Sequence, residues 1–125
     1  MKTIPLDELP TVIEDGPLRV RLRDEAGISV GHVVLPAGAD LRPATRGLPG
    51  DLCPCPHWGY MLKGKVRMHT ADGSQDFAAG EAFYWAPGHA PEALEDSEYV
   101  DFSPTAEFQP VIDHITSGAA EAGAA

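Results

Sequence analysis

Positive charge is scarce in this sequence. Its 125 residues include 9 Lys plus Arg against 19 Asp plus Glu, which gives a formal net charge of -10. Such a charge repels phosphate backbones and anionic membrane surfaces, so neither nucleic acid nor a membrane is expected as a partner. Hydrophobic residues make up 43% of the chain, which is typical of a folded domain, and a chain of this length buries one core.

Long hydrophobic runs are also missing. The N-terminal segment, MKTIPLDELPTVIEDG, has no apolar stretch long enough for a signal-peptide core, and no window approaches the length that crosses a bilayer. We therefore expect a cytoplasmic location. In that reducing compartment Cys53 and Cys55 are not expected to pair, because a disulfide between cysteines separated by one residue would close a strained ring. The two thiols are either free or hold a metal.

Helical periodicity is scarce as well. Thirteen glycines and twelve prolines separate short runs of β-branched, aliphatic and aromatic residues, a pattern typical of an all-β barrel or sandwich. The predicted strands cover residues 18–22, 28–35, 59–62, 65–70, 76–79, 82–86 and 99–102. Thr105 can cap a short helix, so the predicted organisation is an arm (1–17), a β domain (18–104), a helix (105–117) and a flexible tail (118–125).

The segment GDLCPCPHWGY carries the densest group of chemically active side chains. In an extended strand, side chains two residues apart share a face, so Asp51, Cys53, Cys55 and His57 are predicted to point the same way. Thiolates and imidazoles are ligands of zinc, copper and iron, and such a metal needs three or four of them to converge. His89 follows a Pro-Gly turn further along the chain and is the fourth candidate ligand.

The stretch from Asp51 to Glu92 resembles the two motif blocks of the cupin superfamily. Gly64 in YMLKGKV matches the glycine that ends the first motif, and Gly80 and Gly88 match glycines of the second. The resemblance implies a double-stranded β-helix, or jelly-roll barrel, with one metal ion inside. It places His57 where the family has a glutamate ligand and His89 two residues before a family histidine.

The ligand set that follows from this resemblance is Cys53, Cys55, His57 and His89 in place of three histidines and a glutamate. Such a softer set favours a divalent transition metal, zinc first and copper or iron as alternatives, over manganese. Glu92 and Asp51 are the candidate carboxylates for proton transfer. The alternative is that both cysteines are small core residues and both histidines are structural.

Three classes of function follow from this set. The first is a metal-dependent enzyme acting on a small molecule in the barrel. The second is a non-catalytic cupin that binds or senses a metal or a small ligand through a closed Cys/His site. Reversible oxidation of the thiols ranks last, because they lack the C-x-x-C spacing. A homodimer is expected, with the segment 18–22 at a sheet edge as the pairing surface.

Overall fold

The structure is a computed structural model that describes the backbone of residues 1–124 and the side chains of residues 1–118. In chain order its elements are η1 (Leu6–Glu8), β1 (Thr11–Asp15), β2 (Leu18–Glu25), β3 (Ile28–Leu35), α1 (Arg42–Thr45), η2 (Pro49–Asp51), β4 (His57–Lys63), β5 (Lys65–Thr70), β6 (Gly73–Ala78), β7 (Ala82–Trp85), β8 (Ala90–Ala93), β9 (Ser97–Pro104) and α2 (Thr105–Ala124).

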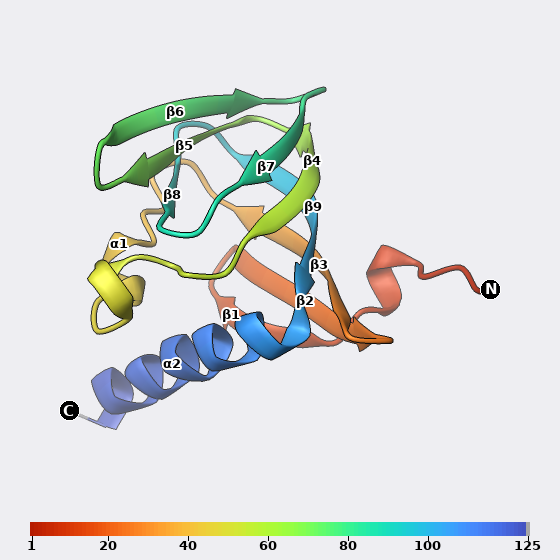
Figure 1. The fold of residues 1–125 in the computed structure, drawn as a ribbon, viewed down its shortest axis with the longest axis horizontal. Helices are drawn as coiled ribbons and strands as arrows, with labels where there is room; N and C mark the ends of the chain where they lie inside the picture. The colour runs from red at the N-terminus through yellow and green to blue at the C-terminus, as the bar shows by residue number, and fades with distance from the viewer. Residues whose placement is uncertain (125) are drawn as a thin grey trace.

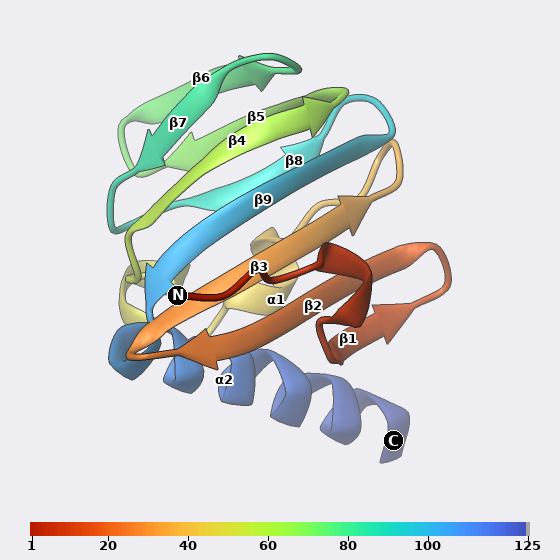
Figure 2. The ribbon, with the colours of Figure 1, turned by 90° about the vertical axis from the view of Figure 1, so that its right-hand side faces the viewer.

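The strands form two antiparallel sheets that face each other. The six-stranded sheet has the order β1-β2-β3-β9-β4-β7 and the three-stranded sheet has the order β6-β5-β8. Figure 1 shows the small sheet at one end of the molecule, and Figure 2 shows α2 lying across the opposite end, beside β2. The two sheets enclose the main core, which joins side chains of both, such as Val33 and Tyr99 from the large sheet and Val66 and Met68 from the small one.

Alternation of side chains fixes which face of each strand is buried. In β9 the residues Ser97, Tyr99, Asp101 and Ser103 are buried, while the residues between them are partly or fully exposed. This alternation is the expected pattern of a strand with one face on a core. It sends an unusual row of polar side chains into the interior.

The β4–β5 turn depends on Gly64. Its φ is +78°, in the region that favours glycine, and a Cβ there would lie 2.2 Å from the carbonyl oxygen of Asp96. Any other residue would therefore be both strained and blocked by backbone. The turn at this glycine connects β4 of the six-stranded sheet to β5 of the three-stranded sheet.

A second apolar cluster closes the end of the barrel. Phe108, Val111 and Ile112 of α2 pack there against Leu22 of β2 and against both cysteines. The helix therefore covers the region into which the cysteine segment folds. Within residues 1–124, no helix is both long enough and apolar enough to span a lipid bilayer.

The all-β architecture with a C-terminal helix is confirmed, with three differences from the sequence prediction. The arm predicted at 1–17 contains β1, which pairs with β2. Because β2 also pairs with β3, the segment 18–22 lies inside the sheet and the prediction of an edge there is wrong. The helix continues past residue 117 to Ala124, so residues 118–124, predicted as a flexible tail, are helical; Ala125 lies outside the described residues.

Candidate metal centre

Cys53 and His89 are joined through their backbones. The amide of Cys53 donates to the carbonyl of His89 at 2.8 Å, and the amide of Gly88 donates to the carbonyl of Cys53 at 2.8 Å. These bonds form an isolated antiparallel bridge between two segments that are far apart in the sequence. The bridge places the thiol of one segment next to the imidazole of the other.

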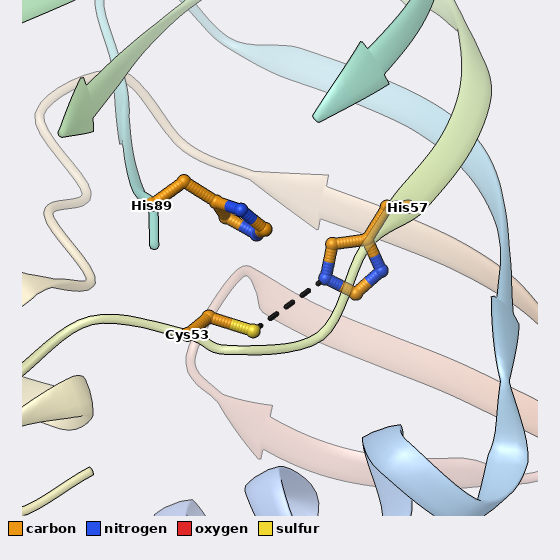
Figure 3. A group of neighbouring side chains, drawn as sticks. All are labelled: Cys53, His57 and His89. Atoms are coloured by element: carbon orange, nitrogen blue, oxygen red, sulfur yellow. Dashed lines mark hydrogen bonds between the residues drawn. The ribbon is translucent and has the colours of Figure 1, made fainter. Parts of the chain in front are cut away.

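His57, the first residue of β4, completes a group of three donors. Cys53 Sγ lies 3.6 Å from His57 Nε2, and the donor atoms of Cys53, His57 and His89 all lie within 4.8 Å of one another. Figure 3 shows the three side chains converging from the loop before β4, from β4 itself and from the start of the β8 segment. All three are buried.

Hydrogen bonds to Nδ1 orient both imidazoles. His89 Nδ1 is 2.7 Å from the carbonyl oxygen of Ala86, which can only accept, so this nitrogen carries the proton. His57 Nδ1 is hydrogen bonded to Ser103 Oγ and lies 3.5 Å from Asp101 Oδ2. The Nε2 of His89 therefore carries a lone pair, and the Nε2 of His57 is directed at Cys53 Sγ. Imidazoles that ligate metals are held in this way, through the nitrogen that does not bind the metal.

Burial sets the charge of the donors. Desolvation, with the nearby His89, lowers the pKa of His57 to about 3, and desolvation also lowers the pKa of His89. Desolvation raises the pKa of the Cys53 thiol to about 11. At neutral pH the rings are thus uncharged, which is the ligating form, while the thiol gives up its proton only when a cation stabilises the thiolate.

Asp101 of β9 is a member of the site that the sequence reading missed. It is buried, and desolvation raises the pKa of its carboxyl group to about 7. Its Oδ1 has no hydrogen-bond partner among the described residues. A Cβ at Gly31, its neighbour on β3, would lie 2.1 Å from that oxygen. A glycine inside a strand often marks a place where another group approaches the backbone closely. Gly31 is such a glycine and pairs with Asp101 across β3 and β9, so it was the one sequence feature that pointed to a crowded position here.

Cys55 lies outside the group of three donors, so its predicted place beside Cys53 is not found. Its Sγ donates to the carbonyl of Pro56 and packs with Phe108 and Val111. Burial, with Cys53 nearby, raises the pKa of this thiol to about 12. The parity prediction failed because Pro54 and Pro56 prevent a regular strand, which begins only at His57.

The two carboxylates predicted to move protons also lie elsewhere. Asp51 is exposed in η2, where its Oδ1 accepts from the amide of Gly47 at 3.0 Å. Glu92 Oε1 is hydrogen bonded to His69 Nε2 at 2.8 Å and lies 3.7 Å from Arg42. Neither lines the cavity beside the three donors. The carboxylate that does line this cavity is Asp101.

A cavity of about 90 Å³ adjoins the three donors. Cys53, His57, His89 and Asp101 line it, together with Tyr99 from β9 and Phe108 from α2. The volume exceeds what one water molecule needs, so the donors border a space that can hold a small ligand.

Solved structures of other proteins share this architecture. KdgF from Halomonas sp. is 22% identical, with a TM-score of 0.60, over 83% of this chain and 94% of its own. A B. subtilis oxalate decarboxylase is 17% identical, with a TM-score of 0.59, over 81% of this chain and 28% of its own. This chain thus spans less than a third of that enzyme's length.

A further B. subtilis oxalate decarboxylase structure, with 21% identity and a TM-score of 0.60 over 81% of this chain and 28% of its own, is described by its Mn(II) centres. No family model matches the sequence, and no curated protein matches it. Both structural neighbours are cupins, so the chain has the cupin fold that the sequence resemblance predicted.

Proposed function

We propose that the protein is a metal-dependent enzyme that binds zinc through Cys53, His57 and His89 and acts on a small molecule in the adjoining cavity. One observation carries the proposal: three donor atoms from separate segments lie within 4.8 Å of one another, in a buried position. Side chains gathered by chance on a surface would have water and neighbouring charges as partners. These three are buried beside one another and line a cavity.

The donor set fits zinc better than manganese. A thiol and two imidazoles are soft or borderline ligands, whereas carboxylate and water oxygens suit manganese. The Nδ1 of each ring is hydrogen bonded to a residue outside the donor group, so Nε2 is the nitrogen that would bind zinc. Copper and iron remain the alternatives for this set.

The number of donors favours a catalytic site over a closed one. Structural zinc sites have four protein ligands, whereas catalytic sites have three and keep a position open. The fourth predicted ligand, Cys55, is not part of the group whose donor atoms lie within 4.8 Å of one another. A sensing role with a closed site would need Cys55 to join that group as a fourth ligand.

A zinc ion held by Cys53, His57 and His89 would polarise a carbonyl group or lower the pKa of a bound water. The residues around it perform distinct tasks. Ser103 and Asp101 fix the plane of the His57 ring through Nδ1. Phe108 stacks edge-on to that ring, with centroids 4.8 Å apart, and excludes water from the α2 side.

Asp101 is the group best placed to hold a proton. Its carboxyl group lines the cavity, and its pKa near 7 lets it exist in either protonation state at neutral pH. We assign it the proton-transfer role that the sequence pattern gave to Glu92 and Asp51.

A homodimer and a cytoplasmic location complete the proposal. Large apolar side chains are exposed on the outer face of the six-stranded sheet, namely Trp58, Tyr60, Tyr84 and Phe102. Trp58 pairs with Tyr84 on one side and with Phe102 on the other, so these residues are contiguous. A contiguous apolar patch of this kind is typical of an interaction surface, and sedimentation velocity on the protein tests whether it pairs two chains.

Metal analysis tests the proposed function directly. Untagged protein, purified without added metal, is analysed for zinc, copper, iron and manganese by mass spectrometry. We expect one zinc ion per chain and a cobalt-substituted form whose spectrum changes when a small ligand is added, since an open position is accessible. Protein without a bound transition metal, and with no affinity for zinc or cobalt, would contradict the proposal.

A further inference from the structure

A second hollow, which we call the outer cleft, lies beside the donor group. It measures about 700 Å³ and is lined by residues of η2, of the β5–β6 hairpin, of β7 and of the loop between β7 and β8. Met68, Trp85 and His89 line both the outer cleft and the inner cavity of about 90 Å³. The two spaces therefore adjoin at one of the three donors.

The two spaces differ in what they can hold. Ligand sites in proteins usually measure about 300 to 1,000 Å³, and the outer cleft falls within this range, whereas the inner cavity falls well below it. The inner cavity has room for about three non-hydrogen atoms, because a water molecule takes about 30 Å³ in the liquid. A substrate of ordinary size that reaches the donors must therefore place most of its atoms in the outer cleft.

The outer cleft carries little charge. Among the described residues that line it, none is Lys or Arg, and Asp72 is the only carboxylate. Thr70, Ser74 and Gln75 add uncharged polar groups to its wall. One carboxylate or carbonyl group of a substrate can pair with the metal. A second anionic group would find no cationic side chain in the cleft, so the part of the substrate that lies there is expected to be uncharged.

Trp85 carries an unused hydrogen-bond donor where the two spaces adjoin. The residue is 3% exposed, and its Nε1 is buried and has no hydrogen-bond partner among the described residues. Its ring is held by stacking on Phe83, with centroids 3.6 Å apart, and its centroid lies 6.1 Å from that of His89. Buried indole N–H groups ordinarily have an acceptor. An oxygen atom on a bound molecule would satisfy this one.

We propose that the substrate spans both spaces. Its carboxylate or carbonyl end lies at the metal in the inner cavity, and its uncharged body lies in the outer cleft, where an oxygen atom accepts a hydrogen bond from Trp85 Nε1. The substrate class is thus an oxo or hydroxy compound with no more than one acidic group. This inference rests on the proposed function, because it names the class of substrate for the same site.

Four probes separate the features of this proposal. Levulinate has the carboxylate end and a ketone oxygen, isocaproate has a methyl group in place of that oxygen, glutarate has a second carboxylate, and acetate has the end group alone. Dissociation constants are measured by NMR titration on zinc-loaded protein and on protein freed of metal by a chelator. We expect levulinate to bind about 3- to 10-fold more tightly than isocaproate in both forms, and glutarate and acetate to bind zinc-loaded protein more weakly than levulinate.

The two tryptophans report the proposed contact directly, because each gives one indole N–H signal. Trp58 is 49% exposed on the outer face of the six-stranded sheet, and Trp58→Phe assigns both signals by removing one. We expect levulinate to shift the Trp85 indole proton downfield and to slow its exchange with solvent, and isocaproate to do neither. No probe should shift the signal of Trp58.

Trp85→Phe removes the indole donor and keeps an aromatic ring against Phe83. We expect this variant to bind levulinate and isocaproate equally. Trp58→Phe is the matched control and should keep the preference for levulinate. The ratio of the two affinities within each variant is insensitive to small changes in folding, and the indole signal of the unmodified protein tests the same contact without any substitution at Trp85.

Several outcomes would overturn the inference. They are no binding of any probe to either form, tighter binding of glutarate than of levulinate, a Trp85 indole signal that does not move at saturation with levulinate, or a ketone preference that survives Trp85→Phe. Zinc content is measured on the same samples. Protein that binds no zinc but keeps the Trp85-dependent preference would refute the metal proposal alone, whereas zinc-binding protein that takes up acetate without showing the preference would refute this inference alone.

Discussion

Two groups of side chains in this molecule, each containing histidine and carboxylate, differ in their exposure to solvent. The inner cluster consists of Cys53, His57, His89 and Asp101, and the outer cluster consists of Asp40, Arg42, His69 and Glu92. The His57 and Asp101 side chains are 6% and 5% exposed, whereas those of His69 and Glu92 are 20% and 29% exposed.

The outer cluster is electrostatically complete. Arg42 lies 2.7 Å from Asp40 Oδ2, and its hydrogen bond lowers the pKa of that carboxyl group. His69 is hydrogen bonded to Glu92 at 2.8 Å. Each carboxylate has a cationic or hydrogen-bonding partner, and water reaches the rest. Exposed groups of this kind contribute little beyond local order.

The inner cluster is incomplete without a ligand. It has two neutral imidazoles, a thiol whose pKa is raised to about 11, and a carboxylate oxygen with no partner among the described residues. Histidine and carboxylate side chains therefore have different consequences in the two places. The buried donors of the inner cluster have no cationic side chain beside them, so a metal ion can bind there. The outer cluster already has Arg42 as its cation.

Outside the three donors themselves, the largest expected effect on zinc affinity comes from changing the carboxylate that supports His57. Asp101→Asn replaces the carboxylate next to His57 Nδ1 with an amide, which no longer favours the ligating orientation as strongly. We expect zinc affinity to fall about 10- to 100-fold. Competition with a chromophoric chelator measures it.

Glu92→Gln is the matched control for this change, since it alters the carboxylate of the outer cluster in the same way. It should leave zinc affinity within about twofold of the unmodified protein, a margin well below the cost of losing a real outer-sphere partner. Equal losses in the two variants would show that the inner and outer clusters do not differ as argued.

The next comparison of the two clusters uses the pH dependence of the free energy of unfolding, measured on the metal-free protein. Because burial lowers the pKa of His57 from 6.5 to about 3, the unfolded chain binds a proton between these values that the folded chain does not. The free energy of unfolding therefore falls as pH falls below 6.5, by up to about 1.4 kcal/mol per pH unit from this group. Asp101, with its pKa raised to about 7 from 3.8, contributes the opposite slope over its own range.

Replacing His57 isolates its share of that slope. Urea unfolding at pH 7, 6 and 5 in a chelator should show a shallower acid-side loss of stability for His57→Gln than for the unmodified protein. His69→Gln, in the outer cluster, should retain the unmodified slope. A His57→Gln variant with an unchanged slope would mean that this imidazole is charged in the folded state.

The last expected effect concerns the space that Asp101 occupies. A methyl group at Gly31 would lie 2.1 Å from Asp101 Oδ1, so Gly31→Ala should lower the free energy of unfolding by about 1 to 3 kcal/mol. Gly118→Ala has no heavy atom within 4 Å of its new Cβ and lies in α2, where alanine is favoured by up to about 1 kcal/mol. Thermal unfolding should shift in opposite directions, and a Gly31→Ala protein as stable as its parent would show that Asp101 has room to move.

Much of the fold could be predicted because short apolar strand segments alternate with Gly- and Pro-containing turns along the sequence. The strand predicted at residues 28–35 coincides with β3, and the glycine at position 64 marked the turn between β4 and β5. The strand β8 was missed because its sequence APEA contains Pro91, which argues against a strand. The length of α2 was missed because a Gly- and Ala-rich segment without apolar bulk gives no periodic signal.

The site was predictable where residue type and family motif position both indicated a ligand. Cys53, His57 and His89 stood out as ligand types near family motif positions, and the structure brings them together. Cys55 was misplaced because a two-residue parity rule fails across Pro54 and Pro56. Asp101 and Tyr99 were overlooked as site residues because their importance lies in burial and in contacts across strands, which a single strand sequence does not record.

The most direct test of the account compares Cys53→Ser with Cys55→Ser. The two substitutions make the same chemical change two residues apart, in buried positions, so they control for each other. We expect Cys53→Ser to lose stoichiometric zinc binding, as measured by elemental analysis after dialysis, because an alcohol is a poor zinc ligand, and Cys55→Ser to retain one zinc ion per chain. Retention of zinc by Cys53→Ser together with its loss from Cys55→Ser would contradict the account.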